Sequence, residues 1–389
     1  MTADAIKTNG LGPILFPFTG AGVGGSHIST FNLARSLVSD YGLRCVVLAV
    51  EGSTIAREAA RVGLEVQAIH GAPARTRSAV GDLLKLAGRL QALRRFGPGA
   101  IVHCNDLWTL QSWGVPGRLL RRPVIYHHRA FESPILPNRL LFGMADAAIC
   151  VSEACRRNLA FLRRDRVHKI VNPYPFPDLS ARETSRWRAE LAERWSAGEQ
   201  ILLIGFAANF QRRKRPTFFL DVCRVLAERE PRVRFVVFGR ERDHSAAELA
   251  AYANELGLTE RIFFAGFRSP PERNLAPLDI LLVPALAEPF GRTLVETLLL
   301  GVPYVATDDE AGNGEIFSLW GGGRLVAPAA TAEQFAEEVM KVVVAPGAVF
   351  LSPERRRHIA EEISPRKHAG KVLDVYRSVL GHVNGLNGQ

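Results

Sequence analysis

Two glutamates in the second half of the chain have the type and spacing of a binding site. Glu288 directly follows an apolar run, and Glu296 lies about one turn into a segment with helical spacing, with Pro289 and Gly291 between them to break the backbone. A carboxylate accepts two hydrogen bonds and suits a vicinal diol, and free N–H groups at a helix start favour an anion. A single carboxylate at a helix start can also serve only to complement the helix dipole.

The surrounding residues predict the elements that hold these glutamates. Apolar runs at Ile280–Val283 and Val302–Ala306 predict two buried strands. A helix is predicted from about Arg292, with its apolar face made by Leu294, Leu298 and Leu299, and Gly301 ends it. In an open α/β sheet, ligands bind at the edge where such strands end.

The segment reads E-P-F-G-x-x-x-x-E followed by G-x-P-x-V-A-T, and it closely resembles the nucleotide-sugar site of retaining GT-B glycosyltransferases of family 4 (glycosyl transferases group 1). The resemblance implies that Glu288 binds hydroxyls of the transferred sugar and that Glu296 holds the ribose hydroxyls. The other residues of this segment that it implies in donor binding are Pro289, Phe290, Gly291 and Leu294. The resemblance covers most of the chain. Its motifs are specific in the second half and match only loosely in the first half.

A cluster of cations follows the first strand predicted for the second half, in the run N-F-Q-R-R-K-R from Asn209 to Arg215. Cations at a strand end suit a pyrophosphate leaving group, although a solvated basic turn has the same composition. The family has G-R-x-x-x-x-K-G here, so the resemblance implies that Lys214 contacts the diphosphate. The family arginine is replaced by Asn209, and Arg212 and Arg213 are the candidates to substitute for it.

A glycine-rich loop, Gly20 to Gly25, follows the first predicted strand and opens a helix, so its N–H groups can surround a phosphate. The loop also matches G-x-G-x-x-G, with Glu51 after the next strand, which makes an NAD-dependent oxidoreductase the rival interpretation. Against it, the last glycine is expected to precede the helix cap Ser26, and no NAD-type chemistry follows downstream. In the resemblance, Gly24 and Gly25 lie near the donor diphosphate.

Two adjacent histidines, His127 and His128, end another predicted strand. The family carries a histidine after this strand, near the sugar and the diphosphate. Because successive side chains of a strand point to opposite faces, only one of the two is expected to face the site, and His128 is preferred. A histidine satisfied in the core is the structural alternative. In the second half, Gly266 lies in F-A-G-F, which resembles the family's turn beside the base pocket.

Short apolar runs alternate with helical stretches along the whole chain, with seven candidate strands before a proline-rich break at residues 172–178 and six after it. This alternation predicts an α/β protein with two parallel, doubly wound sheets. The resemblance implies the GT-B fold, with two Rossmann-like domains facing a cleft. Residues 1–176 are assigned to the acceptor domain, 177–364 to the nucleotide-sugar donor domain, and 365–389 to a C-terminal helix that crosses back to the first domain.

The composition is that of a soluble globular protein, with 389 residues of which 47% are hydrophobic and 23% charged. No apolar run approaches the roughly 20 residues that span a bilayer, and the start lacks the apolar core of a signal peptide. Five scattered cysteines predict free thiols in a reducing cytosol, without disulfides or a structural metal. We therefore expect a cytoplasmic protein.

The net charge of +10 favours anionic partners such as nucleoside diphosphates and acidic lipid headgroups. No motif that reads nucleic acid occurs, so we expect no nucleic-acid partner. A basic amphipathic stretch at Leu83–Arg95, with Arg118, Arg121 and Arg122 near the end of the next helix, is compatible with peripheral contact at the inner face of an anionic membrane. A helix packed on its own sheet is the alternative.

The resemblance implies a retaining, metal-independent hexosyltransferase that moves a sugar from a nucleoside diphosphate sugar to a saccharide or lipid-linked acceptor. Surface polysaccharide or lipid-linked glycan assembly is the setting that it suggests. No cofactor or metal is expected, because Lys214 and helix N-termini can neutralise the diphosphate. The alternatives are a nucleotide-sugar epimerase of the same fold, a non-catalytic sugar-nucleotide-binding protein and, less favoured, the oxidoreductase.

Overall fold

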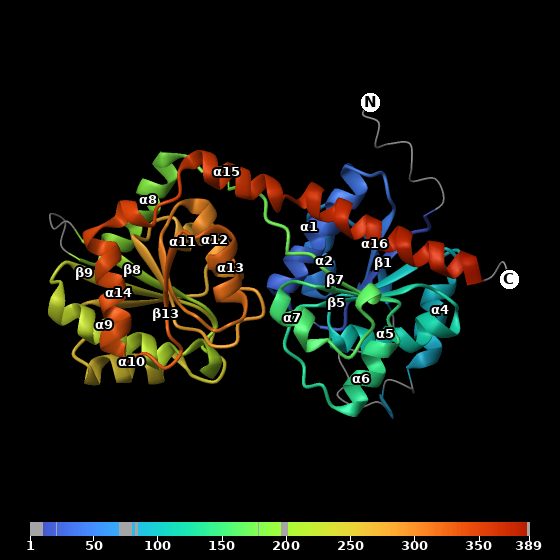
Figure 1. Ribbon diagram of the computed structural model, residues 1–389, viewed down its shortest axis with the longest axis horizontal. Coiled ribbons are helices and arrows are strands. Elements are labelled where there is room, and N and C mark those ends of the chain that lie inside the picture. The colour runs from blue at the N-terminus through green and yellow to red at the C-terminus, as the bar shows by residue number, and fades with distance from the viewer. Residues whose placement is uncertain are drawn as a thin grey trace. The chain divides into compact units, whose positions relative to one another are not determined.

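The computed structural model describes residues 11–20, 22–69, 80–81, 85–177, 179–195 and 201–386, with side chains as far as residue 381. The chain divides into two compact units (Figure 1). The first unit comprises Met1–Pro175 and Ile363–Gln389, and the second comprises Phe176–Glu362. Each unit contains a parallel sheet with helices on both faces.

The first unit has a seven-stranded sheet in the order β3-β2-β1-β4-β5-β6-β7. Its strands are β1 (Ile14–Pro17), β2 (Cys45–Val50), β3 (Glu65–Ile69), β4 (Ile101–Cys104), β5 (Val124–His128), β6 (Ala147–Cys150) and β7 (Val167–Lys169). Its helices are α1 (Gly25–Ser39), α2 (Thr54–Arg61), α4 (Leu86–Arg94), α5 (Leu107–Leu119), α6 (Leu136–Gly143), α7 (Glu153–Asn158) and α16 (Pro365–Leu386), with a 3-10 turn η2 at Arg164–Arg166.

The second unit has a six-stranded sheet in the order β10-β9-β8-β11-β12-β13. Its strands are β8 (Leu202–Ala207), β9 (Val233–Phe238), β10 (Ile262–Gly266), β11 (Ile280–Val283), β12 (Tyr304–Thr307) and β13 (Gly323–Val326). Its helices are α8 (Ala181–Ala192), α9 (Pro216–Arg229), α10 (Ala246–Glu255), α11 (Glu272–Leu275), α12 (Arg292–Leu300), α13 (Gly312–Trp320), α14 (Ala332–Val344) and α15 (Pro353–Glu362), with 3-10 turns η3 (Arg212–Lys214) and η4 (Pro346–Ala348).

The seven and six strands predicted from the sequence are confirmed, and so is their parallel pairing. The strands could be predicted because strands buried on both faces of a sheet are continuous apolar runs in the sequence. An example is the wholly buried C-V-V-L-A of β2. The sequence predicts the last strand before the proline-rich break at Lys169–Val171, and the structure has it two residues earlier, as the edge strand β7. Ile170, which belongs to the hydrophobic core, follows the strand instead of lying within it.

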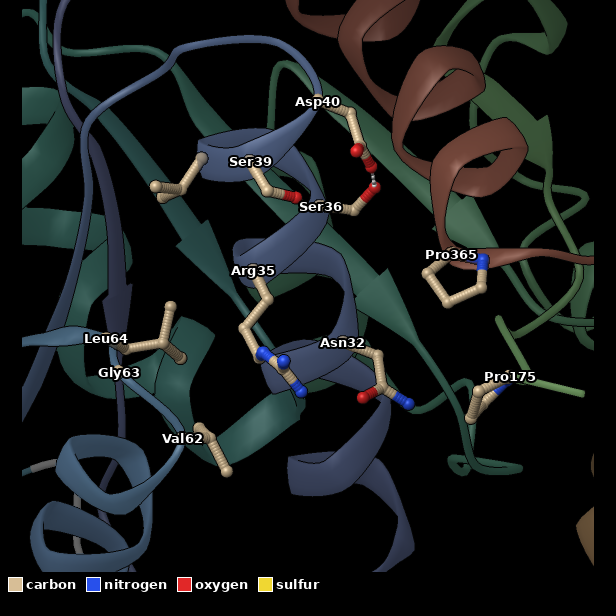
Figure 2. A pocket seen from close by; sticks show the side chains of 11 residues that line it. Asn32, Arg35, Ser36, Ser39, Asp40, Val62, Gly63, Leu64, Pro175 and Pro365 are labelled. Atoms are coloured by element: carbon tan, nitrogen blue, oxygen red, sulfur yellow. Dashed lines mark hydrogen bonds between the residues drawn. The ribbon is translucent and has the colours of Figure 1, made fainter. Parts of the chain in front are cut away.

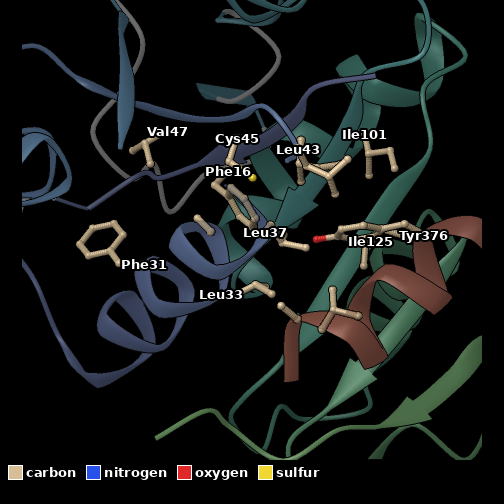
Figure 3. Close-up of a cluster of buried hydrophobic side chains, with 14 of the residues drawn as sticks. Phe16, Phe31, Leu33, Leu37, Leu43, Cys45, Val47, Ile101, Ile125 and Tyr376 are labelled. Carbon is tan, nitrogen blue, oxygen red and sulfur yellow. The ribbon is translucent and has the colours of Figure 1, made fainter. Parts of the chain in front are cut away.

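The hydrophobic core of the first unit is completed by α16, which comes from the far end of the sequence (Figure 3). Phe16 and Ile125 from the sheet and Leu33 and Leu37 from α1 are buried in the same cluster as Tyr376 of α16. The second unit has its own hydrophobic core, in which aliphatic side chains surround Phe206, Phe219, Phe235 and Phe335. Each sheet is therefore stabilised by a separate set of buried apolar side chains.

Several arginines of the basic stretch near α4 are structural. Arg89 is buried and donates to the carbonyl of Ser112. Arg122 is also buried, and its guanidinium donates to the last carbonyls of α4 and the turn after it, those of Leu93, Phe96 and Gly97. The leucines of α4 are buried or half-buried. In the described part of this stretch, α4 is thus a helix packed against α5 of its own unit, and Leu83 lies outside the described residues.

Candidate functional site

In both sheets the strand order reverses at the first strand, so that the next strands are added on its other side. The predicted site residues follow the strands that meet at this switch point. In the first unit β1 lies between β2 and β4, and in the second β8 lies between β9 and β11. The loops after two such neighbouring strands separate and leave a crevice in which α/β proteins bind ligands. In the second unit, these loops are Asn209–Lys214 after β8 and the E-P-F-G loop, Glu288–Gly291, after β11.

The E-P-F-G loop is fixed on both sides. Phe290 is buried, as is Leu294 in the first turn of α12. Glu288 donates from its backbone N–H to Asp309 Oδ2 at 2.7 Å and accepts at its carbonyl from the N–H of Gly312, also at 2.7 Å. The loop is therefore held by the segment that leads into α13.

Gly291 is required by the conformation of this loop. It caps α12 with φ of +85°, in the left-handed region that favours glycine. A Cβ there would lie 3.1 Å from Ile316 and 3.3 Å from Asn313 Oδ1. The helix start has no capping side chain, so an anion can approach the first N–H groups of α12. Pro289 lies between Glu288 and the buried Phe290 and helps to set this turn.

The structure brings Lys214 and Glu288 together. Lys214 Nζ and Arg213 Nη1 both donate to Glu288 Oε2, the latter at 3.0 Å. Burial opposes ionisation of Glu288, but the two cations outweigh it, and the pKa of this carboxyl lies below its ordinary value. Burial lowers the pKa of Lys214 in spite of the opposing charge of Glu288. Arg213, and not Arg212, is the neighbouring arginine that reaches this carboxylate.

Glu296 has a different partner. Its carboxylate accepts from Arg292 at 2.7 Å, one turn earlier on α12, and only 17% of the side chain is exposed. Burial raises the pKa of Glu296 in spite of Arg292. Glu288 lies in the E-P-F-G loop and Glu296 in the helix that follows it. The carboxylate of Glu288 contacts the cations of η3, whereas that of Glu296 contacts an arginine of α12 itself.

The other predicted donor residues of the second unit lie at neighbouring strand ends. Asn209 is exposed in the turn after β8. Gly266 ends β10 with φ of +68°, and the next residue, Phe267, is 56% exposed. The guanidinium of Arg240, after β9, lies 3.7 Å from the centroid of the Phe267 ring. This pair is an exposed flat surface on which a nucleotide base could stack. The sequence motif predicted only Gly266 as a donor-binding residue here.

In the first unit, the glycine loop leads into α1 differently from the prediction. Gly24 is the N-cap and Gly25 is the first helical residue, so the expected cap at Ser26 is wrong. A glycine without a side-chain cap is tolerated here because His27 turns back and accepts from the N–H of Gly24 at 3.2 Å. The position of the last glycine therefore does not count against the dinucleotide fingerprint.

The adjacent histidines point to opposite faces of the first sheet, and both are fully buried. His128 hydrogen-bonds through Nδ1 to the Tyr126 hydroxyl at 2.8 Å and through Nε2 to Asn158 Oδ1 at 3.0 Å. His127 Nδ1 accepts from Arg129 at 3.0 Å. His127 Nδ1 also lies 3.2 Å from Nε2 of the buried His103, so both histidines are engaged within the fold, and His127 is in addition connected to a side chain just past the strand end. A catalytic role for either one stays a prediction.

Arg129 is the centre of a polar network that the sequence did not single out. It donates to Asn172 Oδ1 at 2.6 Å, and Thr30 Oγ1 lies 3.4 Å from its Nη2. Thr30 in turn donates to Asn105 Oδ1, while the Asn105 amide nitrogen is buried without a hydrogen-bond partner in the described residues. Asn105, Arg129 and Asn172 follow β4, β5 and β7, and Thr30 lies on α1. These side chains therefore come together only once the sheet has formed.

The buried histidines of the first unit should make its stability depend on pH. Burial lowers the pKa of His128 to about 4, whereas in the unfolded chain it titrates near 6.5. Between these pH values only the unfolded chain binds the proton, which favours unfolding. The free energy of unfolding is therefore highest above about pH 6.5 and falls as the pH decreases. From pH 7 to pH 5, we expect His128 to account for a loss of about 2 kcal/mol.

Urea unfolding at several pH values would measure this loss. The variant H128Q should show a shallower decrease of unfolding free energy between pH 7 and pH 5 than the unmodified protein. His358, exposed on α15, offers the matched control H358Q. Equal slopes for H128Q and the unmodified protein would contradict the assignment of a buried neutral imidazole.

The cysteines and the clustered titratable side chains of the described residues are the groups that could ligate a metal ion. Cys45, Cys104, Cys150, Cys155 and Cys223 are all buried free thiols. Among the described residues, no group of three or more His, Cys, Asp or Glu side chains is arranged to hold a metal ion. Within the same ranges, no helix has the length and apolar character needed to cross a membrane.

Models of two glycosyltransferase families match the two units. The model described as Glycosyltransferase Family 4 matches residues 23–175, and the model described as Glycosyl transferases group 1 matches residues 188–363. Anabaena HepE, whose crystal structure contains UDP and glucose, has a similar fold, with a TM-score of 0.78 over 94% of this chain and 99% of HepE at 20% sequence identity. The fold is therefore GT-B, and these matches support a glycosyltransferase of the GT-B class.

Two relatives show sequence similarity in part of the chain. The 2-deoxystreptamine glucosyltransferase of Streptomyces kanamyceticus is 30% identical over 182 residues, 46% of either chain. The O-antigen biosynthesis glycosyltransferase WclY of Escherichia coli is 29% identical over 164 residues, 42% of this chain and 43% of WclY. The matched regions thus span somewhat less than half the length of these relatives.

Proposed function

We propose that the protein is a retaining glycosyltransferase of family 4 that moves a sugar from a nucleoside diphosphate sugar to a hydroxyl group of an acceptor. One observation carries the proposal: Lys214 and Arg213 meet Glu288 beside the uncapped start of α12, at the switch point of the second sheet. Two cations and a helix N-terminus suit a diphosphate, and an ionised carboxylate between them suits sugar hydroxyls.

In the proposed reaction, the bond between the sugar and the diphosphate breaks, and negative charge develops on the leaving phosphate. Lys214 and Arg213 lie where they could stabilise this charge without a metal ion. Glu288, whose pKa is lowered, is ionised at neutral pH and would accept hydrogen bonds from the sugar. The acceptor hydroxyl attacks from the same face that the diphosphate leaves, and the leaving phosphate takes its proton. Glu296 would hold the ribose hydroxyls.

The relatives suggest which substrates to test first. HepE was crystallised with UDP and glucose, and WclY acts in O-antigen biosynthesis. We therefore propose a hexose donor carried on a nucleoside diphosphate, with UDP as the first candidate, and a saccharide or lipid-linked acceptor of surface polysaccharide assembly.

A membrane-peripheral location in the cytoplasm is part of the proposal. The apolar surface that could support it lies on and before α6, where Ile135, Leu136 and Leu140 are exposed. Arg139 projects from the same short helix, with its guanidinium 4.8 Å from the Phe161 ring centroid. Exposed leucines beside an arginine suit an anionic bilayer surface, and this part of the first unit fits that role better than α4.

Nucleotide binding should depend on Glu296. In thermal unfolding without added metal, one nucleoside diphosphate from a panel of UDP, GDP, CDP, ADP and dTDP is expected to stabilise the protein, by about 2.7 kcal/mol at 100 times its Kd. Removing a carboxylate that binds the ribose should weaken that nucleotide roughly 10- to 100-fold in E296A. Glu337, exposed on α14, supplies the control variant E337A.

Three outcomes would argue against the proposal. Stabilisation by NAD(H) alone would favour the oxidoreductase. Conversion of a nucleoside diphosphate sugar into its epimer without an acceptor would favour the epimerase. Equal nucleotide affinity in E296A and E337A would remove Glu296 from the donor site.

A further inference from the structure

A pocket of about 370 Å³ lies in the first unit along the later turns of α1 (Figure 2). α1 begins at the carboxyl ends of the strands with Gly25, and the pocket is formed from Asn32 onward. Its apolar walls are Val62 and Leu64 from the turn between α2 and β3, together with Pro175 and Pro365. It therefore lies away from the glycine loop, and the donor residues of the second unit do not line it.

The polar side chains of the pocket come from one face of α1. Asn32, Arg35 and Ser39 follow one another at intervals of three and four residues, which places them side by side on a helix. Among the described residues, neither the Asn32 amide nor the Arg35 guanidinium has a hydrogen-bond or ion-pair partner. Asp40 is fixed by a hydrogen bond from Ser36 Oγ, drawn in Figure 2. The described side chains of the pocket thus present one guanidinium without an ion-pair partner, together with an amide, a hydroxyl and a carboxylate.

These groups define the chemistry of an occupant. A guanidinium with five N–H donors binds phosphate or carboxylate, and an amide, a hydroxyl and a carboxylate together suit neighbouring hydroxyl groups. The volume is at the small end of ligand sites, and the walls are aliphatic and proline rings. We propose that this pocket binds a monosaccharide carrying one anionic group, either a sugar phosphate or a sugar acid.

In the proposed complex, the anionic group lies on Arg35, and the sugar hydroxyls lie near Asn32, Ser39 and Asp40. Pro175 ends the first stretch of the first unit, and Pro365 begins α16 shortly after the chain returns to it. A ligand in the pocket would touch both segments through which the chain leaves and re-enters this unit. The inference is independent of the donor site, since none of the residues that it uses belongs to the second unit.

Isothermal titration calorimetry of the full-length protein would test the proposal. The probes are glucose 6-phosphate, mannose 6-phosphate, glucuronate and galacturonate, with glucose and inorganic phosphate as comparators. We expect at least one anionic sugar to bind more tightly than both comparators. R35A should weaken it by about tenfold or more and N32A by a smaller factor. The two sugar phosphates and the two sugar acids distinguish the possible sources of the charge.

Two control variants separate this site from others. R57A removes an exposed arginine of α2 that does not line the pocket and should leave binding unchanged. E296A should also bind the anionic sugar normally, even though its nucleotide binding is impaired. The proposal is overturned if no probe binds, if inorganic phosphate binds as tightly as the sugar phosphates, or if E296A abolishes binding while R35A does not.

Discussion

Replacing Lys214 with alanine should lower kcat for sugar transfer by roughly 10²- to 10³-fold. Lys214 is 16% exposed, and its ammonium group contacts Glu288 beside the start of α12, so it is held in place before any donor binds. A fixed charge of this kind requires little rearrangement when negative charge develops on the leaving diphosphate. Initial rates at saturating donor, with each candidate UDP-sugar, would measure the effect.

Arg212 provides the matched control, because it lies in the same 3-10 turn but is exposed. R212A should retain nearly the full rate. Since K214A leaves the buried Glu288 carboxylate with Arg213 as its remaining cation, its folded state must be verified by urea unfolding. If a well-folded K214A loses only tenfold or less in kcat, Lys214 does not stabilise the leaving group.

Adding one methyl group at Gly312 should reduce kcat/KM for the donor by roughly 10²-fold. A Cβ at this position would lie 2.5 to 2.6 Å from backbone atoms of Glu288 and Phe290. These atoms cannot rotate away as a side chain would, so G312A must displace the E-P-F-G loop or the start of α13. The displacement would move Glu288 relative to Lys214 without removing either functional group.

Gly314, two residues later in α13, separates this effect from a general loss of helix flexibility. A Cβ there would lie 2.6 Å from Asp308 Oδ1, at the mobile end of a side chain, and 3.7 Å from the carbon that carries this oxygen. G314A should therefore change kcat/KM by no more than about threefold. Similar losses in both variants would mean that the close contact at Gly312 does not position the loop.

The local parts of the fold and of the donor site could be predicted from the sequence. The strands around the E-P-F-G loop are continuous apolar runs, and the loop carries its own proline and glycine, so neighbouring residues suffice to define it. The contact between Glu288 and the η3 turn spans 74 residues. The resemblance named both partners and left Arg212 and Arg213 open as substitutes for the family arginine. The choice of Arg213, and the contacts of Asp309 and Asn313, emerged only from the packing of separate loops.

Other features depended on tertiary structure that spacing does not encode. Arg89 and Arg122 read as surface charge in the sequence, but each is buried because backbone carbonyls lie within reach of its guanidinium. Arg129 follows a conspicuous pair of histidines and was overlooked, because its partners come from α1 and from the end of β7. Gly24 caps α1 because the side chain of His27 supplies the acceptor that glycine lacks.

The position of α16 has a consequence for the order in which the protein can fold during synthesis. The second unit is one continuous stretch, Phe176–Glu362, and it contains its complete core once that stretch has left the ribosome. The first unit begins earlier, but Val372, Leu373 and Tyr376 of its core are translated only after the whole second unit. The domain that emerges first is therefore the one that finishes last, and until then the apolar faces of α1 and its sheet are available to chaperones.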